Sequence, residues 1–209
     1  MDFDELIELM EAIAKGEIED ASQISFPHVI ALEQALNRVV YVGDIVPGIG
    51  KDVDEQIRFW NDYDEAKGIP VEEREPIKVY IDSCGGSLIE SFTIIDSITL
   101  SKTPVWTIAT GAAYSGGFFI FISGHKRIAY PLSSFLYHEG STGTSGDAGK
   151  FRNYAAFYEK QMKQLKNVVL KHTKIDEDTY EKHIKDDWWF TTEEALEYGI
   201  CDEISKELI

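Results

Sequence analysis

The 209-residue sequence predicts an α/β fold built on a largely parallel sheet. Short runs rich in β-branched and aromatic residues alternate with longer amphipathic stretches, and Gly or Pro marks many of the boundaries between them. This alternation is typical of strand–helix–strand units, whose strands are parallel. The expected strands are residues 38–42, 77–81, 105–109, 125–130 and 135–137. The expected helices are residues 51–68, 88–100, 150–172 and 191–198.

Several of these helices carry local signals of their own. The first of them places Val53, Ile57 and Trp60 on one helical face, which we expect to be buried. The last begins with Thr191 and has Glu194 three residues later, the pattern of a capping box. The sequence therefore predicts both the buried face of one helix and the start of another.

The N-terminal part of the chain stands apart from this pattern. Residues 3–14 and 29–36 have apolar residues at helical spacing. We expect a helical segment over residues 1–37, followed by one domain over residues 38–209. A domain of that length can bury a substantial core.

Composition and charge exclude several classes of function. The formal net charge of −17 argues against nucleic acid or an anionic membrane as the main partner, because both require a basic surface. No apolar run approaches the roughly 18 residues that span a bilayer, and the acidic N-terminus does not resemble a signal peptide. Cys84 and Cys201 form neither a disulfide framework nor a metal cluster. We expect a cytoplasmic protein without a metal or cofactor.

The segment TIATGAAYSGGFFIF (107–121) contains the first candidate for chemistry. Ser115 lies among Ala112, Ala113, Gly116 and Gly117. A nucleophile needs room for a substrate carbonyl, and glycine allows backbone N–H groups to approach an oxyanion. The same small residues would also suit tight packing between a helix and a strand.

Two further segments add candidate groups. YIDSCGGS (80–87) runs from a strand into a paired-glycine turn, which can present N–H groups to an anion. It lacks the Lys-Ser/Thr of a P-loop and the third glycine of a dinucleotide fingerprint, so we exclude nucleotide binding. SSFLYHEG (133–140) ends a strand at His138, which could act as a general base or be a structural histidine.

In order and spacing, the motifs DSCGG, GAAYSGG, LYHEG and EALEYGICD resemble those of ClpP, the proteolytic subunit family of the Clp protease, over about residues 38–204. The resemblance implies a ClpP/crotonase-like fold with repeated β-β-α units and residues 150–172 as the family's long handle helix. It implies a serine endopeptidase that hydrolyses unfolded polypeptides inside an oligomeric chamber. The expected assembly is a pair of stacked heptameric rings, with an AAA+ unfoldase as partner.

The resemblance also assigns roles to individual residues. Ser115 would be the nucleophile and His138 its general base. The N–H groups of Gly86 and Gly116 would form the oxyanion hole. Gly116 stands where the family has Met, and Cys84 stands where it has Pro.

The acid of the triad departs from the family pattern. Counting back from the closing motif, the family's Asp falls on His183, which cannot supply a buried anion. Asp187 is our preferred replacement, and Asp186 is the alternative. This departure motivates a second hypothesis, a catalytically weak or inactive ring subunit with a structural or docking role. A third hypothesis, a crotonase-type enzyme acting on acyl-CoA, has little support because few basic residues near the motifs could hold the CoA phosphates.

Overall fold

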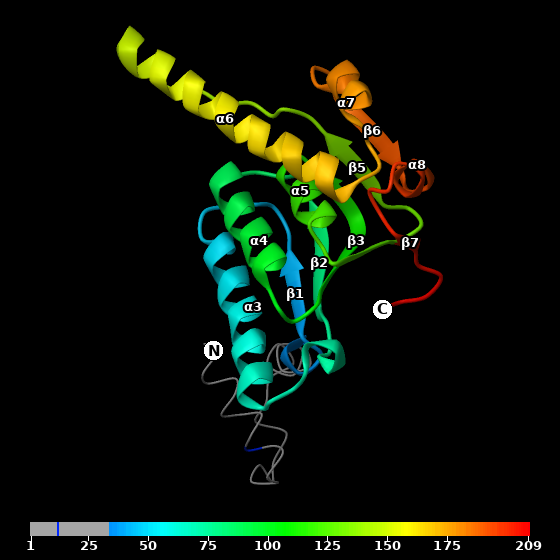
Figure 1. Ribbon diagram of the computed structural model, residues 1–209. Coiled ribbons are helices and arrows are strands. Elements are labelled where there is room, and N and C mark those ends of the chain that lie inside the picture. Colours follow the sequence, from blue (N-terminus) through cyan, green and yellow to red (C-terminus); the bar gives the residue numbers. More distant parts are fainter. Residues whose placement is uncertain (1–11, 13–33) are drawn as a thin grey trace, which may run out of the picture.

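A computed structural model describes residue 12 and residues 34–209 (Figure 1). It confirms the predicted α/β class. Five strands of one seven-stranded sheet are parallel neighbours and form the main sheet, in the order β1-β2-β3-β4-β7. Its strands are β1 (Val39–Val42), β2 (Ile77–Ser83), β3 (Val105–Tyr114), β4 (Lys126–Ala129) and β7 (Glu203–Ile204).

The end of β3 has a second set of partners. Residues 112–114 of β3 pair in parallel with β5 (Ser134–Tyr137). On its other side β5 pairs antiparallel with β6 (Trp188–Thr191). The C-terminal ends of β3 and β5 and the start of β6 are therefore brought to one edge of the structure.

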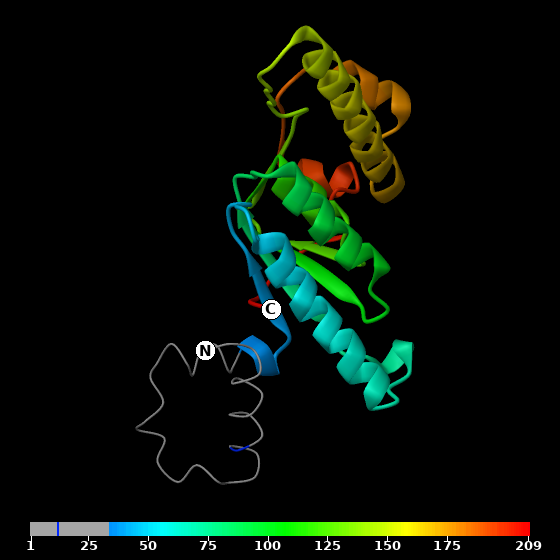
Figure 2. The ribbon, with the colours of Figure 1, turned by 90° about the vertical axis from the view of Figure 1, so that its left-hand side faces the viewer.

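Helices α3 (Ile49–Ala66) and α4 (Leu88–Leu100) lie side by side on one face of the main sheet (Figures 1 and 2). Val53, Ile57 and Trp60 of α3 are buried, as predicted. The short helix α5 (Gly116–Ile122) is buried along its whole length. These helices and the sheet enclose the main apolar core.

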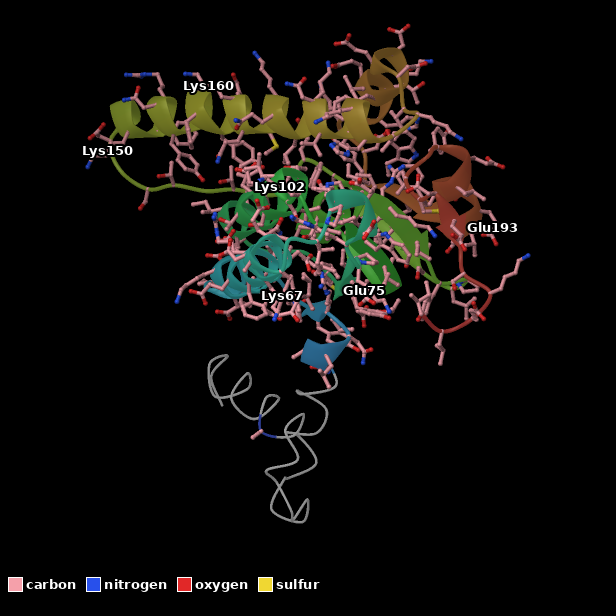
Figure 3. The ribbon with its side chains drawn as sticks, turned by 60° about the horizontal axis from the view of Figure 1, so that its bottom comes forward. Lys67, Glu75, Lys102, Lys150, Lys160 and Glu193 are labelled. Carbon is pink, nitrogen blue, oxygen red and sulfur yellow. The ribbon has the colours of Figure 1, made fainter. Side chains whose placement is uncertain are left out.

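Helix α6 (Ala148–His172) confirms the long helix predicted over residues 150–172. Only Leu165 and Val169 on this helix are buried, while Phe151 and Phe157 in its N-terminal half are exposed. In Figure 3 the half that carries Lys150 extends beyond the body of the domain.

The C-terminal part holds two short helices. These are α7 (Glu177–His183) and α8 (Thr192–Glu197). The predicted capping box at the start of α8 is confirmed, with Thr191 as N-cap and Glu194 as its partner. Within the described residues, no helix has both the length and the hydropathy needed to cross a bilayer.

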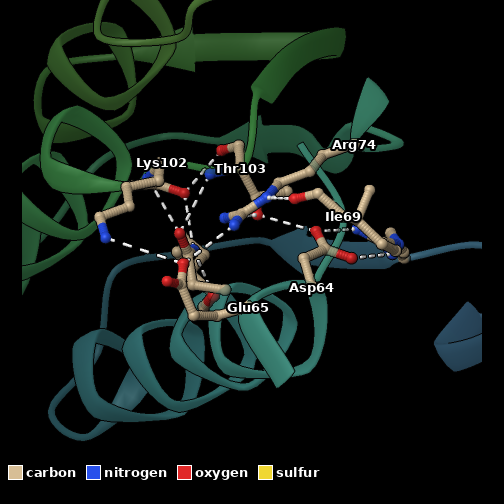
Figure 4. Close-up of polar contacts among 10 residues, drawn as sticks. Asp64, Glu65, Ile69, Arg74, Lys102 and Thr103 are labelled. Atoms are coloured by element: carbon tan, nitrogen blue, oxygen red, sulfur yellow. Dashed lines mark hydrogen bonds and ion pairs between the residues drawn. The ribbon is translucent and has the colours of Figure 1, made fainter. Parts of the chain in front are cut away.

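A buried polar network ties the start of β1 to α3. The guanidinium of Arg38 donates to both carboxylate oxygens of Asp64, at 2.6 and 2.7 Å. The hydroxyl of Thr103 donates to Asp64 at 2.8 Å, and Arg74 reaches the same hydroxyl and Glu65 (Figure 4). Because both partners of the Arg38–Asp64 pair are buried and hydrogen-bonded, removal of one would leave an uncompensated charge.

The structure differs from the prediction at the end of β3. The sequence predicted a strand that ends at residue 109 and a Gly- and Ala-rich turn after Gly111, but the strand continues to Tyr114. The side chain of Asp82 accepts the N–H of Ala112 at 2.9 Å, and a Cβ at Gly111 would lie 2.4 Å from the same carboxylate. Gly111 therefore suits the strand because the carboxylate of Asp82 leaves no room for a side chain there.

Other elements were absent from the prediction. These are α7, β6, β7 and a short 3-10 helix, η2 (Val71–Glu73). The predicted helix at residues 3–14 and most of that at residues 29–36 lie outside the described residues. The same holds for most of the expected N-terminal segment, residues 1–37.

Candidate active site

Strand pairing brings three of the candidate side chains to one edge of the sheet. Ser115 directly follows β3, and its N–H donates to the carbonyl of Leu136 in β5 at 2.9 Å. His138 directly follows β5. Asp187 directly precedes β6, which is antiparallel to β5. The first residue of β6, Trp188, therefore lies opposite the last residue of β5, Tyr137. The register alone thus gathers residues 115, 138 and 187.

The backbone of Ser115 is strained. Its φ of 54° and ψ of −119° are unusual for a residue with a side chain, and it forms the sharp turn between β3 and α5. Gly85 packs against this turn, since a Cβ at position 85 would lie 2.7 Å from the Cβ of Ser115. The surrounding structure therefore holds the serine in a conformation that it would not otherwise favour.

Ser115 and His138 line the same pocket, which has a volume of about 520 Å³. Gly86 and Gly116 also line it. Helices α4, α5 and α6 supply an apolar wall, which includes Leu88, Ile89, Phe119, Phe157, Met162 and Leu165. Among residues 34–209, no group forms a hydrogen bond with the Ser115 hydroxyl.

The two candidate acids contact different histidines. Oδ1 of Asp187 lies 3.5 Å from Nδ1 of His138. Oδ2 of Asp186 lies 3.5 Å from Nδ1 of His183, whose ring stacks on Trp188. The structure therefore places Asp187, and not Asp186, against His138. The Asp187 side chain is 66% exposed and that of His138 is 31% exposed.

The two glycines expected to form the oxyanion hole line the same pocket as Ser115, and neighbouring backbone groups among the described residues do not use their N–H groups. In the bridge between Ile45 and Gly86, the hydrogen bonds are made by the N–H of Ile45 and the N–H of Ser87, so the N–H of Gly86 is not used. Gly116 is the first residue of α5, whose first N–H groups have no partner within the helix. A Cβ at Gly116 would lie 2.5 Å from Oγ of Ser91, which explains the absence of a larger residue there.

Some residues at the pocket were not singled out from the sequence. Tyr154 and Tyr158 of α6 and Thr142 of the preceding loop form its polar rim. The four-residue spacing of the two tyrosines places them on one helical face, a signal that the sequence did contain. Cys84 is exposed and also lines the pocket. Within the described part of the chain, no group of three or more His, Cys, Asp or Glu residues could hold a metal ion.

The pocket combines a serine on a strained strand-to-helix turn, a histidine with a carboxylate neighbour and two glycine N–H groups. These are the components of a serine hydrolase site.

Comparison with known proteins identifies the family within this class. A family model described as Clp protease matches residues 70–207. The chain therefore belongs to the Clp protease family, and its fold is the predicted ClpP/crotonase-like fold.

Two curated relatives show how far the similarity extends. The chain is 33% identical over 134 residues to "ATP-dependent Clp protease proteolytic subunit 2" of Treponema denticola, covering 63% of this chain and 67% of that protein. It is 33% identical over 139 residues to "ATP-dependent Clp protease proteolytic subunit 1" of Streptomyces avermitilis, covering 66% and 64%. The matches thus span about two thirds of each relative.

Proposed function

We propose that this protein is a serine endopeptidase subunit in which Ser115, His138 and Asp187 form the catalytic triad. The observation that carries the proposal is the strand register, which places Ser115 and His138 at adjoining strand ends that open into one pocket. An α/β scaffold that fixes a hydroxyl and an imidazole in this way can support acyl transfer.

In the proposed mechanism, Oγ of Ser115 attacks the carbonyl carbon of the peptide bond. Nε2 of His138 takes the serine proton and later gives it to the departing amine. Asp187, beside Nδ1 of His138, orients the ring and stabilises its protonated form. The N–H groups of Gly86 and Gly116 donate to the oxyanion of the tetrahedral intermediate. Water then hydrolyses the acyl-enzyme with the same histidine as base.

The proposal includes the setting of the reaction. The substrate is an unfolded polypeptide, the chain acts in paired heptameric rings, and an AAA+ unfoldase delivers the substrate. The relatives' names support the last point, because both contain the words "ATP-dependent". We also propose a cytoplasmic location, which fits two free cysteines.

Active-site labelling tests the proposal. A fluorophosphonate probe should label the wild-type protein at Ser115, and Ser115→Ala should abolish labelling. Ser145→Ala, which alters an exposed serine in the loop before α6, serves as the matched control and should label normally. If the wild type is not labelled while a known Clp peptidase is labelled under the same conditions, the proposal is wrong.

One observation favours a second candidate function, a ring subunit with weak or no activity. The 3.5 Å between His138 and Asp187 exceeds the about 2.7–2.9 Å of a strong charge-assisted hydrogen bond. A peptidase assay of the isolated assembly, with and without a catalytic relative, separates the two functions. Peptidase activity of the isolated protein that equals that of the catalytic relative, and is lost in Ser115→Ala, would exclude the second.

A further inference from the structure

The chain directly after His138 receives little support from the sheet. Strand β5 and its pairing with β6 end at Tyr137. Gly140 has a φ of +74°, and residues 140–147 are exposed and belong to no helix or strand. In this chain another contact has to hold the segment after His138.

Helix α6 supplies that contact. The hydroxyl of Tyr158 donates to the carbonyl of Glu139 at 2.6 Å. One turn earlier, the hydroxyl of Tyr154 contacts the hydroxyl of Thr142. Two side chains on one face of α6 thus hold the segment that follows His138 at two points. Burial raises the pKa of Tyr158, with smaller contributions from Glu139 and Tyr154, so its hydroxyl stays protonated and able to donate.

We infer that Tyr158 is a positioning residue, whose hydrogen bond to the carbonyl of Glu139 fixes the backbone next to His138 and thereby the direction of the imidazole. The inference rests on the proposed function, because it needs His138 to act as a base. Holding the peptide group after residue 139 limits rotation of the adjoining backbone, and the ring of His138 follows that backbone. Small displacements of a catalytic group lower the rate of reaction.

Tyr158 also lines the pocket, so its hydroxyl could instead contact the substrate. The two roles have different kinetic consequences. A positioning role lowers kcat and the rate of reaction with a probe too small to fill the pocket, and it leaves KM unchanged. A role in substrate binding alone raises KM and leaves the reaction with the small probe unchanged.

The test is Tyr158→Phe, which removes the hydroxyl and keeps the ring. Diisopropyl fluorophosphate measures the reactivity of Ser115, and a short fluorogenic peptide gives kcat and KM. We expect the labelling rate and kcat to fall together by about 2- to 10-fold, the range for loss of one hydrogen bond. Tyr63→Phe, at an exposed tyrosine of α3, is the matched control and should react like the wild type.

Amide hydrogen exchange provides a readout that does not depend on activity. In Tyr158→Phe, peptides covering residues 138–147 should exchange faster than in the wild type, while peptides from β2 and β3 should not change. Unchanged exchange in residues 138–147 would overturn the inference, as would wild-type labelling by Tyr158→Phe or an effect on KM alone. If the wild-type protein itself is not labelled, the proposed function fails, and the inference fails with it.

Discussion

Replacement of Asp187 by Asn tests the electrostatic part of the site most directly. At the observed 3.5 Å, the attraction between an imidazolium and a carboxylate is about 1 kcal/mol at a dielectric constant of ~80 and about 5 kcal/mol at ~20. Because Asp187 is 66% exposed, the lower end of this range applies. Each 1.4 kcal/mol corresponds to about tenfold in rate. We therefore expect kcat to fall about 5- to 10-fold, less than the about 10⁴-fold known for a buried triad acid.

The chain offers a matched control for this experiment. Asp186→Asn removes a neighbouring carboxylate that faces His183 instead of His138, so kcat should stay near the wild-type value. Asp187 does not line the pocket, and KM should be unchanged in both variants. Peptidase kinetics on purified assemblies measure these values. Full activity of Asp187→Asn, or a larger loss in Asp186→Asn, would refute the assignment of the acid.

Three other predictions concern stability and thiol reactivity. Asp64→Leu should lower the free energy of unfolding by about 3–5 kcal/mol in urea titrations, because it leaves the guanidinium of Arg38 buried without a partner. Burial alone would raise the pKa of Asp64, but hydrogen bonds from Arg38 and a threonine outweigh it and hold that pKa below its ordinary value. The contribution of Asp64 to stability should thus be present above pH about 4 and be lost as the pH falls through the lower folded-state pKa. The free energy of unfolding of the wild type should show this loss at low pH, and that of Asp64→Leu should not. Iodoacetamide at pH 8 should modify the exposed Cys84 and spare Cys201 until urea is added, because Cys201 is buried and burial raises its pKa to about 11. Mass spectrometry of the intact protein measures the number of modified thiols. Rapid modification of both thiols without urea would contradict the prediction. Thr191→Ala should reduce stability by about 1 kcal/mol, seen as a lower Tm, since it removes the N-cap of α8; an unchanged Tm would show that the cap contributes nothing.

Sequence patterns were sufficient where local rules decide the structure. Helices α3, α4 and α6 were predicted from apolar spacing and breakers, and the start of α8 from its capping box. Ser115 and His138 were chosen because their motifs occur in a recognisable order, and the structure places both at one pocket. Their catalytic roles stay predictions.

The remaining features depend on contacts between distant parts of the chain. Gly111 suggested a turn, but its small size serves the close approach of Asp82 from the neighbouring strand. The four residues of β6 are aromatic or β-branched and favour a strand, but nothing within them shows that the strand pairs with β5. The choice between Asp186 and Asp187 also follows from that pairing, since the register decides which carboxylate meets His138. Periodicity along one segment cannot supply such information.

The attachment of the site to strand ends has a practical consequence for labelling this protein. A single residue inserted into β5 would turn alternate side chains to the opposite face and remove His138 from the edge. Residues 143–146 lie between the Thr142 contact and the start of α6, and they are exposed. A fluorophore or short affinity peptide in this loop would leave the register of β3, β5 and β6 unchanged, because the loop belongs to no strand.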